Sequence, residues 1–135
     1  LKKININLKI EITTPSILRQ GKAKGKYNFF RASWIADYPN PENYFDLFYS
    51  KNKTPNGPNY TYFKNKIYDS IYNNLIDEKL NIEKSYEILE NIIYDFSPII
   101  PLYYDMSIRL IDKNIIGMSN NAINMLNLEE VNKLQ

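Results

Sequence analysis

The chain has 135 residues, about the length of one ordinary domain, and its hydrophobic (44%), aromatic (14%) and charged (24%) fractions are typical of a globular protein. Its 17 basic and 15 acidic residues leave a net charge of +2, too little for a protein that holds nucleic acid mainly through phosphate contacts. Cysteine and histidine are both absent, which excludes disulfides, thiolate nucleophiles, Cys-type zinc sites and the Ser-His-Asp triad. These absences exclude most common enzyme mechanisms, and we expect no catalytic residue, cofactor or bound metal.

The N-terminal third predicts a strand, a short helix and a second strand. Aliphatic and polar residues alternate over residues 4–12, which places the aliphatic side chains on one face of a half-buried strand. Thr14 followed by Pro15 predicts an N-cap and a first helical position, and therefore a helix over residues 16–20. The aromatic-rich residues 27–34 form the second expected strand. The chain starts with neither a methionine nor an apolar signal core, so we expect a longer parent chain.

A proline-rich loop follows the second expected strand. Pro39 and Pro41 fix backbone angles in residues 37–41, so neither a strand nor a helix can continue through them. A short helix is expected over residues 42–49. An exposed loop is expected over residues 51–60, and its two Asn-x-Thr sequons are interpreted as accidents of an Asn-rich chain.

Two amphipathic helices and a third strand complete the predicted order. Helical spacing of apolar residues predicts one helix around residues 67–76 and a second that Asn81 caps and Pro98 ends. Residues 102–111 return to strand character, and Gly117 marks a turn. The order strand, helix, strand, loop, helices, strand indicates an α/β or α+β fold.

The segment from Trp34 to Asp37 is the most informative candidate site. An aromatic ring beside a fixed carboxylate suits a ligand with a cationic head and an apolar body. A core tryptophan with an Asx-turn aspartate explains the same spacing at least as well. Asp37 could also join Glu42 or Asp46 as the carboxylate pair of a hydrolase, although the spacing fixes no separation between them. A third alternative is a scaffold whose tyrosine-rich surface binds another protein.

A basic cluster lies between the first helix and the second expected strand, and consists of Arg19, Lys22, Lys24 and Lys26. It lacks the Lys-Ser/Thr pair of a phosphate-binding loop. A solvated turn is therefore a better interpretation than a phosphate site.

Four segments in chain order carry a resemblance to a known family: residues 1–8 (LKKININL), 34–41 (WIADYPNP), 59–75 with Asp69 inside the helix, and 87–104 (EILE to DFSPIIPLYY). Together with the Gly117 turn, they resemble the C-terminal part of the oligopeptide/dipeptide/nickel class of ABC-transporter solute-binding proteins (bacterial extracellular solute-binding protein family 5). Two departures are Asn5, where the family commonly has glycine, and Asn40, where it commonly has aspartate. Asparagine can adopt left-handed backbone angles, so the first departure costs little.

The resemblance implies a fold and a place for the chain within it. The implied fold is α/β, a two-lobed periplasmic-binding-protein-like (type II) fold with a mixed sheet flanked by helices. Residues 1–103 would be the C-terminal part of lobe II, and residues 104–135 the crossover and return segment to lobe I. The N-terminal part of the parent protein would be missing.

The resemblance also implies peptide binding for import by an ABC transporter, without catalysis. Asp37 would pair with the α-ammonium group of a peptide that has a free N-terminus. Trp34 would line a side-chain pocket, and the backbone of Ile35 and Ala36 would bond the ligand main chain. The implied partners are the peptide and the membrane permease subunits, with no nucleic acid. The implied location is periplasmic, or lipid-anchored at the cell envelope as a lipoprotein.

Overall fold

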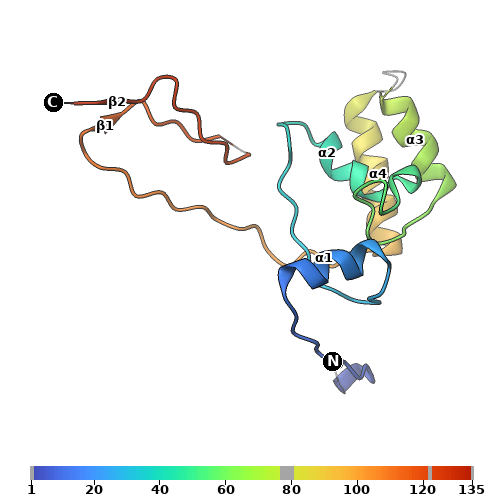
Figure 1. The fold of residues 1–135 in the computed structure, drawn as a ribbon. Coiled ribbons are helices and arrows are strands. Elements are labelled where there is room, and N and C mark those ends of the chain that lie inside the picture. The colour runs from blue at the N-terminus through green and yellow to red at the C-terminus, as the bar shows by residue number, and fades with distance from the viewer. Residues whose placement is uncertain (1, 77–80, 122, 135) are drawn as a thin grey trace.

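The computed structural model describes residues 2–76, 81–121 and 123–134, so Leu1 of the first resembling segment lies outside it. Three helices form the main body: α2 (Glu42–Phe45), α3 (Lys66–Ile76) and α4 (Ile82–Phe96). The helix α1 (Pro15–Ala23) lies at one end of this body (Figure 1). After α4 the chain runs away from the helices to a ribbon of two short antiparallel strands, β1 (Ile115–Ile116) and β2 (Asn132–Lys133).

The core lies between α2, α3 and α4 and is rich in tyrosine. Its buried members are Phe45, Phe48, Tyr49, Tyr68, Tyr72, Leu75 and Leu89. A buried tyrosine hydroxyl needs a hydrogen-bond partner, and each of these has one. Tyr68 donates to the Phe45 carbonyl oxygen at 2.7 Å, and Tyr49 donates to Asn73 Oδ1 at 2.5 Å. Aromatic packing and satisfied hydroxyls together hold the helices in place.

The predicted helices are confirmed, with changed bounds. Thr14 Oγ1 accepts from the Ile17 N–H at 3.4 Å and caps α1, which continues to Ala23 rather than ending at residue 20. Asn81 caps α4 by accepting from the Lys84 N–H at 3.0 Å. The helix expected over residues 42–49 is shorter, because α2 gives way to a 3-10 turn over Asp46–Phe48.

The strands predicted over residues 4–12, 27–34 and 102–111 are not formed in this structure. The first of these segments opens with a 3-10 turn, Lys2–Ile4, and then leaves its aliphatic side chains in solvent, with Ile12 93% exposed. A strand needs a neighbouring strand for its N–H and C=O groups. Within the described residues the only paired strands are β1 and β2, so the predicted mixed sheet is absent there.

Residues 51–60 were expected to be exposed, and two of them are instead buried. Thr54 is buried, and Asn59 is fully enclosed. The side chain of Asn59 donates to the carbonyl oxygens of Tyr49 (3.1 Å) and Phe63 (3.0 Å). The loop therefore folds back onto the core, and Asn59 has a structural role that its place in a sequon does not reveal.

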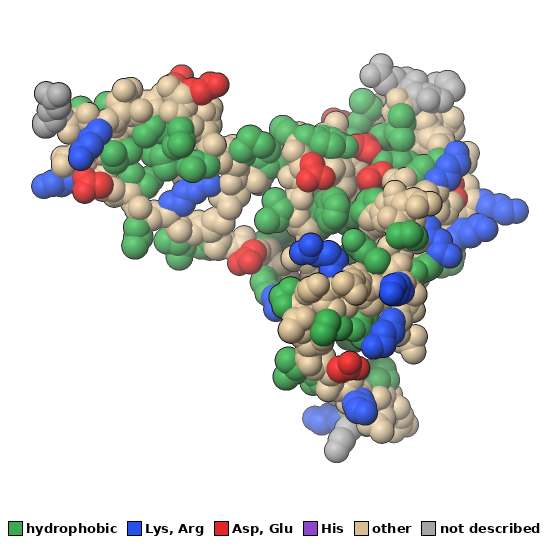
Figure 2. All heavy atoms as spheres, in the orientation of Figure 1, with side chains coloured by type: hydrophobic (Ala, Val, Ile, Leu, Met, Phe, Trp, Pro, Cys, Tyr) green, Lys and Arg blue, Asp and Glu red, His purple; other side chains and the backbone are tan. Residues whose placement is uncertain are grey.

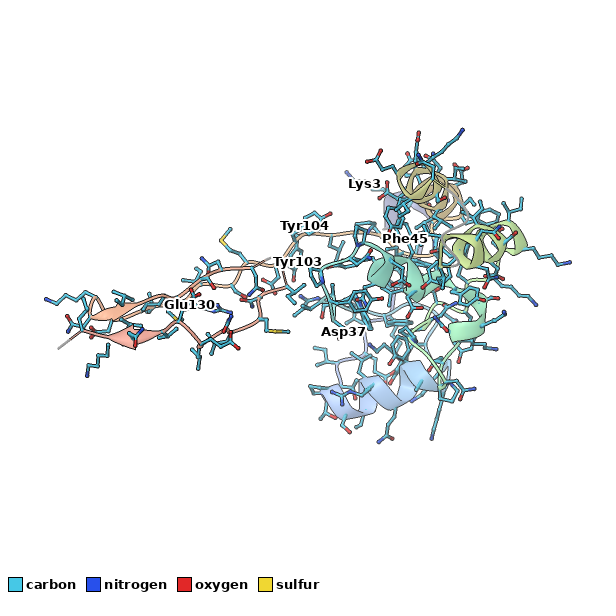
Figure 3. All side chains as sticks on the ribbon, turned by 90° about the horizontal axis from the view of Figure 1, so that it is seen from above. Lys3, Asp37, Phe45, Tyr103, Tyr104 and Glu130 are labelled. Carbon is cyan, nitrogen blue, oxygen red and sulfur yellow. The ribbon has the colours of Figure 1, made fainter. Side chains whose placement is uncertain are left out.

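Of two predicted backbone features, one is confirmed and the other lies at a different place. Asn5 adopts a left-handed φ of 56°, a backbone conformation that asparagine was expected to tolerate at this position. Gly117 has φ 81° and follows β1, where a Cβ atom would come within 2.0 Å of the Glu130 carbonyl oxygen. The predicted turn itself precedes β1, at residues 113–114, and Gly117 allows the close approach of Glu130, which Figure 3 labels in the ribbon.

Many apolar side chains lie at the surface, and Figure 2 shows them over both the extended C-terminal segment and the helical body. None of the described helices is both long and apolar enough to span a membrane. The described residues also hold no cluster of three or more acidic side chains arranged for a metal ion.

Candidate functional site

The candidate site is the loop that connects the end of residues 27–34 to α2. Burial alternates over residues 34–37: Trp34 is half-buried and Ala36 is buried, whereas Ile35 (67% exposed) and Asp37 face solvent. Alternation with a period of two is the mark of an extended backbone. Residues 34–37 therefore alternate between facing the body and facing solvent, and residues 38–40 are exposed.

Asn43, on the first turn of α2, fixes this loop. Its Oδ1 atom accepts a hydrogen bond from Trp34 Nε1 at 2.9 Å and a second from the Asp37 backbone N–H at 3.1 Å. The Asn43 side chain is buried, and both of its partners can only donate, so its amide oxygen must face them. The Oδ1 atom of Asn43 thus holds both Trp34 and Asp37, the two residues whose side chains are expected to contact a ligand.

Asn40 ties the other end of the loop to the helices. Its Oδ1 atom accepts from the Glu42 N–H and from the Tyr86 hydroxyl, each at 3.0 Å. Tyr86 in turn stacks on Phe45, with ring centroids 5.0 Å apart. The loop is therefore anchored to both α2 and α4, even though its outer face is open.

The carboxylate of Asp37 has no hydrogen-bond or ion-pair partner among the described residues, and it is exposed. In Figure 3 Asp37 lies at the edge of the helical body, on the side from which the C-terminal segment with Tyr103 and Tyr104 departs. A fixed backbone with a free carboxylate can accept a hydrogen bond from a cationic group.

The backbone of Ile35 and Ala36 is also free. Within the described chain, neither the N–H nor the C=O group of these two residues has a hydrogen-bond partner. Unpaired groups on an extended backbone can pair with another extended chain, as an added strand does.

Glu42 and Asp46 have other roles. Glu42 accepts from the hydroxyls of both Tyr38 and Tyr72, and Asp46 Oδ1 lies 3.0 Å from the Tyr72 hydroxyl. Burial and these acidic neighbours raise the pKa of Tyr72, so its hydroxyl remains a donor. No contact within the described residues joins either acid to the carboxylate of Asp37. Both acids therefore serve as hydrogen-bond acceptors for tyrosine hydroxyls, whereas the carboxylate of Asp37 does not.

The basic cluster is only partly the solvated turn that the sequence predicts. Gly21 and Lys22 belong to α1, and the Lys22 ammonium lies 4.7 Å from the centre of the Tyr60 ring and 5.6 Å from that of Phe30. Burial, and then the nearby Arg19, lower the pKa of Lys22. Lys22 is thus a packing residue that joins α1 to residues 51–60.

Sequence reasoning identified Trp34 and Asp37 but missed Asn43. The signal was weak, since asparagine is common throughout the chain. One local feature could have indicated Asn43: it is a polar residue at the start of a helix, shortly before the core residues Phe45 and Phe48.

Comparison with known proteins gives two curated relatives. The chain is 27% identical over 113 residues to a Haemophilus influenzae protein that its name describes only as a binding protein, covering 81% of this chain and 21% of that protein. It is 23% identical over 133 residues to the dipeptide-binding protein DppE of Bacillus subtilis, covering 96% of this chain and 24% of that protein. No family model matches the chain. The chain therefore spans about a fifth to a quarter of the length of these relatives, and it is similar to binding proteins.

Proposed function

We propose that the chain is the C-terminal portion of a family 5 solute-binding protein that binds peptides for import by an ABC transporter. The observation that carries the proposal is the exposed, unpartnered carboxylate of Asp37 on a loop whose backbone is fixed. The similarity to a dipeptide-binding protein over 96% of the chain supports the same ligand class. In this role the protein binds and releases its ligand and catalyses nothing.

The peptide would lie along the loop as an added strand. Asp37 accepts hydrogen bonds from the α-ammonium group of the peptide, and the free backbone of Ile35 and Ala36 pairs with its main chain. The ring of Trp34 borders the pocket for a side chain. Backbone pairing reads no side-chain identity, so it suits a transporter that accepts many peptides.

The remainder of the binding site would come from a second lobe outside this chain. Two features support that arrangement: the relatives are about four times as long as this chain, and three segments with strand patterns have no partner strand among the described residues. In the proposal, residues 1–103 complete lobe II and residues 104–135 cross back to lobe I. Hinge closure then encloses the peptide, and the closed protein presents it to the permease. Such a protein works in the periplasm or on a lipid anchor at the cell envelope.

Incubation of the full-length protein with a peptide library, followed by mass spectrometry of bound and free fractions, tests this proposal. A binding protein retains intact peptides with free N-termini. Shortened products that accumulate with time would instead support the carboxylate-dependent hydrolase with Asp37 and Glu42 or Asp46. Retention of no peptide at all would contradict the proposed function.

A further inference from the structure

We infer that Asn43 is the positioning residue of the candidate site, and that its single amide oxygen sets both the ammonium-binding carboxylate and the pocket-lining indole before a ligand arrives. This inference rests on the proposed peptide-binding function. It concerns a residue that touches no ligand and acts through Trp34 and Asp37.

The position of Asn43 is fixed by the core. Two residues further along α2, the ring of Phe45 is buried and stacks on Tyr86 of α4. One residue before it, Glu42 accepts a hydrogen bond from the buried Tyr72 of α3. The helix that carries Asn43 is thus attached to both larger helices, so its side chain is a rigid support.

The two hydrogen bonds to Asn43 use both lone pairs of its Oδ1 atom. One bond fixes the plane of the Trp34 ring, and the other fixes the backbone from which the Asp37 side chain projects. Without this acceptor, two N–H donors lose their partner and the loop gains conformational freedom. A loop that must be ordered when a ligand binds lowers affinity, because binding then bears the entropy cost.

Two substitutions separate positioning from packing. Asn43→Leu keeps nearly the same size and removes the acceptor, whereas Asn43→Asp keeps an acceptor oxygen at the same place. Asn91→Leu is the matched control, since Asn91 lies exposed on α4 and makes no side-chain hydrogen bond within the described residues. Far-UV circular dichroism verifies that each variant retains its helices.

The first measurement is acrylamide quenching of the fluorescence of Trp34, the only tryptophan in the 135-residue chain. We expect Asn43→Leu to raise the quenching constant, and Asn43→Asp and Asn91→Leu to leave it near the wild-type value. Equal quenching in Asn43→Leu and wild type would overturn the inference, because the indole would then be held by packing alone.

The second measurement is calorimetry on the full-length protein with the tightest-binding library peptide and its N-acetylated form. We expect Asn43→Leu to weaken binding of the free peptide by about tenfold and to reduce the preference for free over acetylated peptide, since ordering a freed loop side chain on binding costs about that much. Asn43→Asp should restore the preference. If wild type binds and discriminates but Asn43→Leu keeps the full preference, only the inference is wrong. If wild type binds no peptide, the proposed function is wrong and the inference falls with it.

Discussion

Buried asparagine side chains organise this chain at the scale of single residues. Asn43 holds the candidate site, and Asn59 holds two backbone carbonyls beneath the loop that precedes α3. Asn59 also accepts from the Thr61 hydroxyl at 3.0 Å, so three of its hydrogen-bonding positions are used. The loops of this chain lack strand pairing within the described residues. The asparagine side chains supply hydrogen bonds that hold these loops in place.

Asn59→Leu should lower the free energy of unfolding by about 2–4 kcal/mol, because the Phe63 carbonyl loses its donor and the Tyr49 carbonyl keeps only the Asn52 N–H. Asn56→Leu, at an exposed position of the same loop, is the control and should change stability by less than about 0.5 kcal/mol. Urea unfolding followed by circular dichroism measures both. Equal stability of the two variants would mean that the Asn59 hydrogen bonds contribute nothing.

The sequence predicts the candidate site loop but not its support. Trp34 and Asp37 stand out because a lone tryptophan and an acid precede a pair of prolines. Asn43 and Asn59 do not, because the hydrogen bonds of a buried amide depend on which segments the fold brings together. That information is not local in the chain.

At the scale of elements, helices were predictable and strands were not. The helices α3 and α4 satisfy their own backbone groups and carry local signals, such as the apolar stripe and the Asn81 cap. A strand satisfies its backbone only against another strand. The alternating pattern of residues 4–12 therefore indicates a strand preference, but no partner strand pairs with this segment among the described residues.

The tyrosines of the helical core should make the free energy of unfolding depend on pH in the alkaline range. Burial, followed by nearby acids, raises the pKa of Tyr68 and of Tyr72 above the ordinary value. Above about pH 10 the unfolded chain releases these two protons while the folded chain keeps them, so folded protein binds more protons. Stability should therefore fall as pH rises above 10, by up to about 1.4 kcal/mol per pH unit for each tyrosine.

Urea unfolding at pH values from 8 to 11 measures this slope. Tyr72→Phe should be less stable at pH 8 and should show a shallower decline, because one of the two retained protons is gone. Tyr94→Phe is the control, since the Tyr94 side chain is 82% exposed. A wild-type stability that stays constant from pH 9 to 11 would show that the core tyrosines ionise equally in both states.

At the scale of the whole molecule, the chain has more large apolar side chains than the helical body buries. The segment after α4 exposes a run of large apolar side chains, namely Ile99, Ile100, Leu102, Met106, Ile108 and Leu110. Arg31 donates to the Tyr103 hydroxyl and lies against its ring, which links this segment to the strand-patterned residues before the candidate site. In the proposed two-lobed protein, these side chains would be covered by the rest of the parent chain.

The 135-residue chain by itself should self-associate, because extended apolar segments with unpaired backbone groups are templates for pairing. Size-exclusion chromatography with light scattering at two concentrations measures this. Ile108→Lys with Leu110→Lys should shift the chain toward monomer. Ser119→Lys with Asn120→Lys adds the same charge at exposed polar positions and should not. A concentration-independent monomer for the unsubstituted chain would contradict the expectation.

Calorimetry on the full-length protein tests most directly whether Asp37 binds the ammonium group of a peptide. Wild type and Asp37→Ala are each titrated with one peptide in its free and N-acetylated forms, which makes a thermodynamic cycle with the ligand as one partner. In the closed site an ammonium group without its carboxylate is left uncompensated, at a cost of about 3–5 kcal/mol. We therefore predict that Asp37→Ala weakens binding of the free peptide about a hundredfold or more and loses most of the preference over the acetylated form. A coupling energy near zero would show that Asp37 does not bind the ammonium group and is only a turn-forming loop residue.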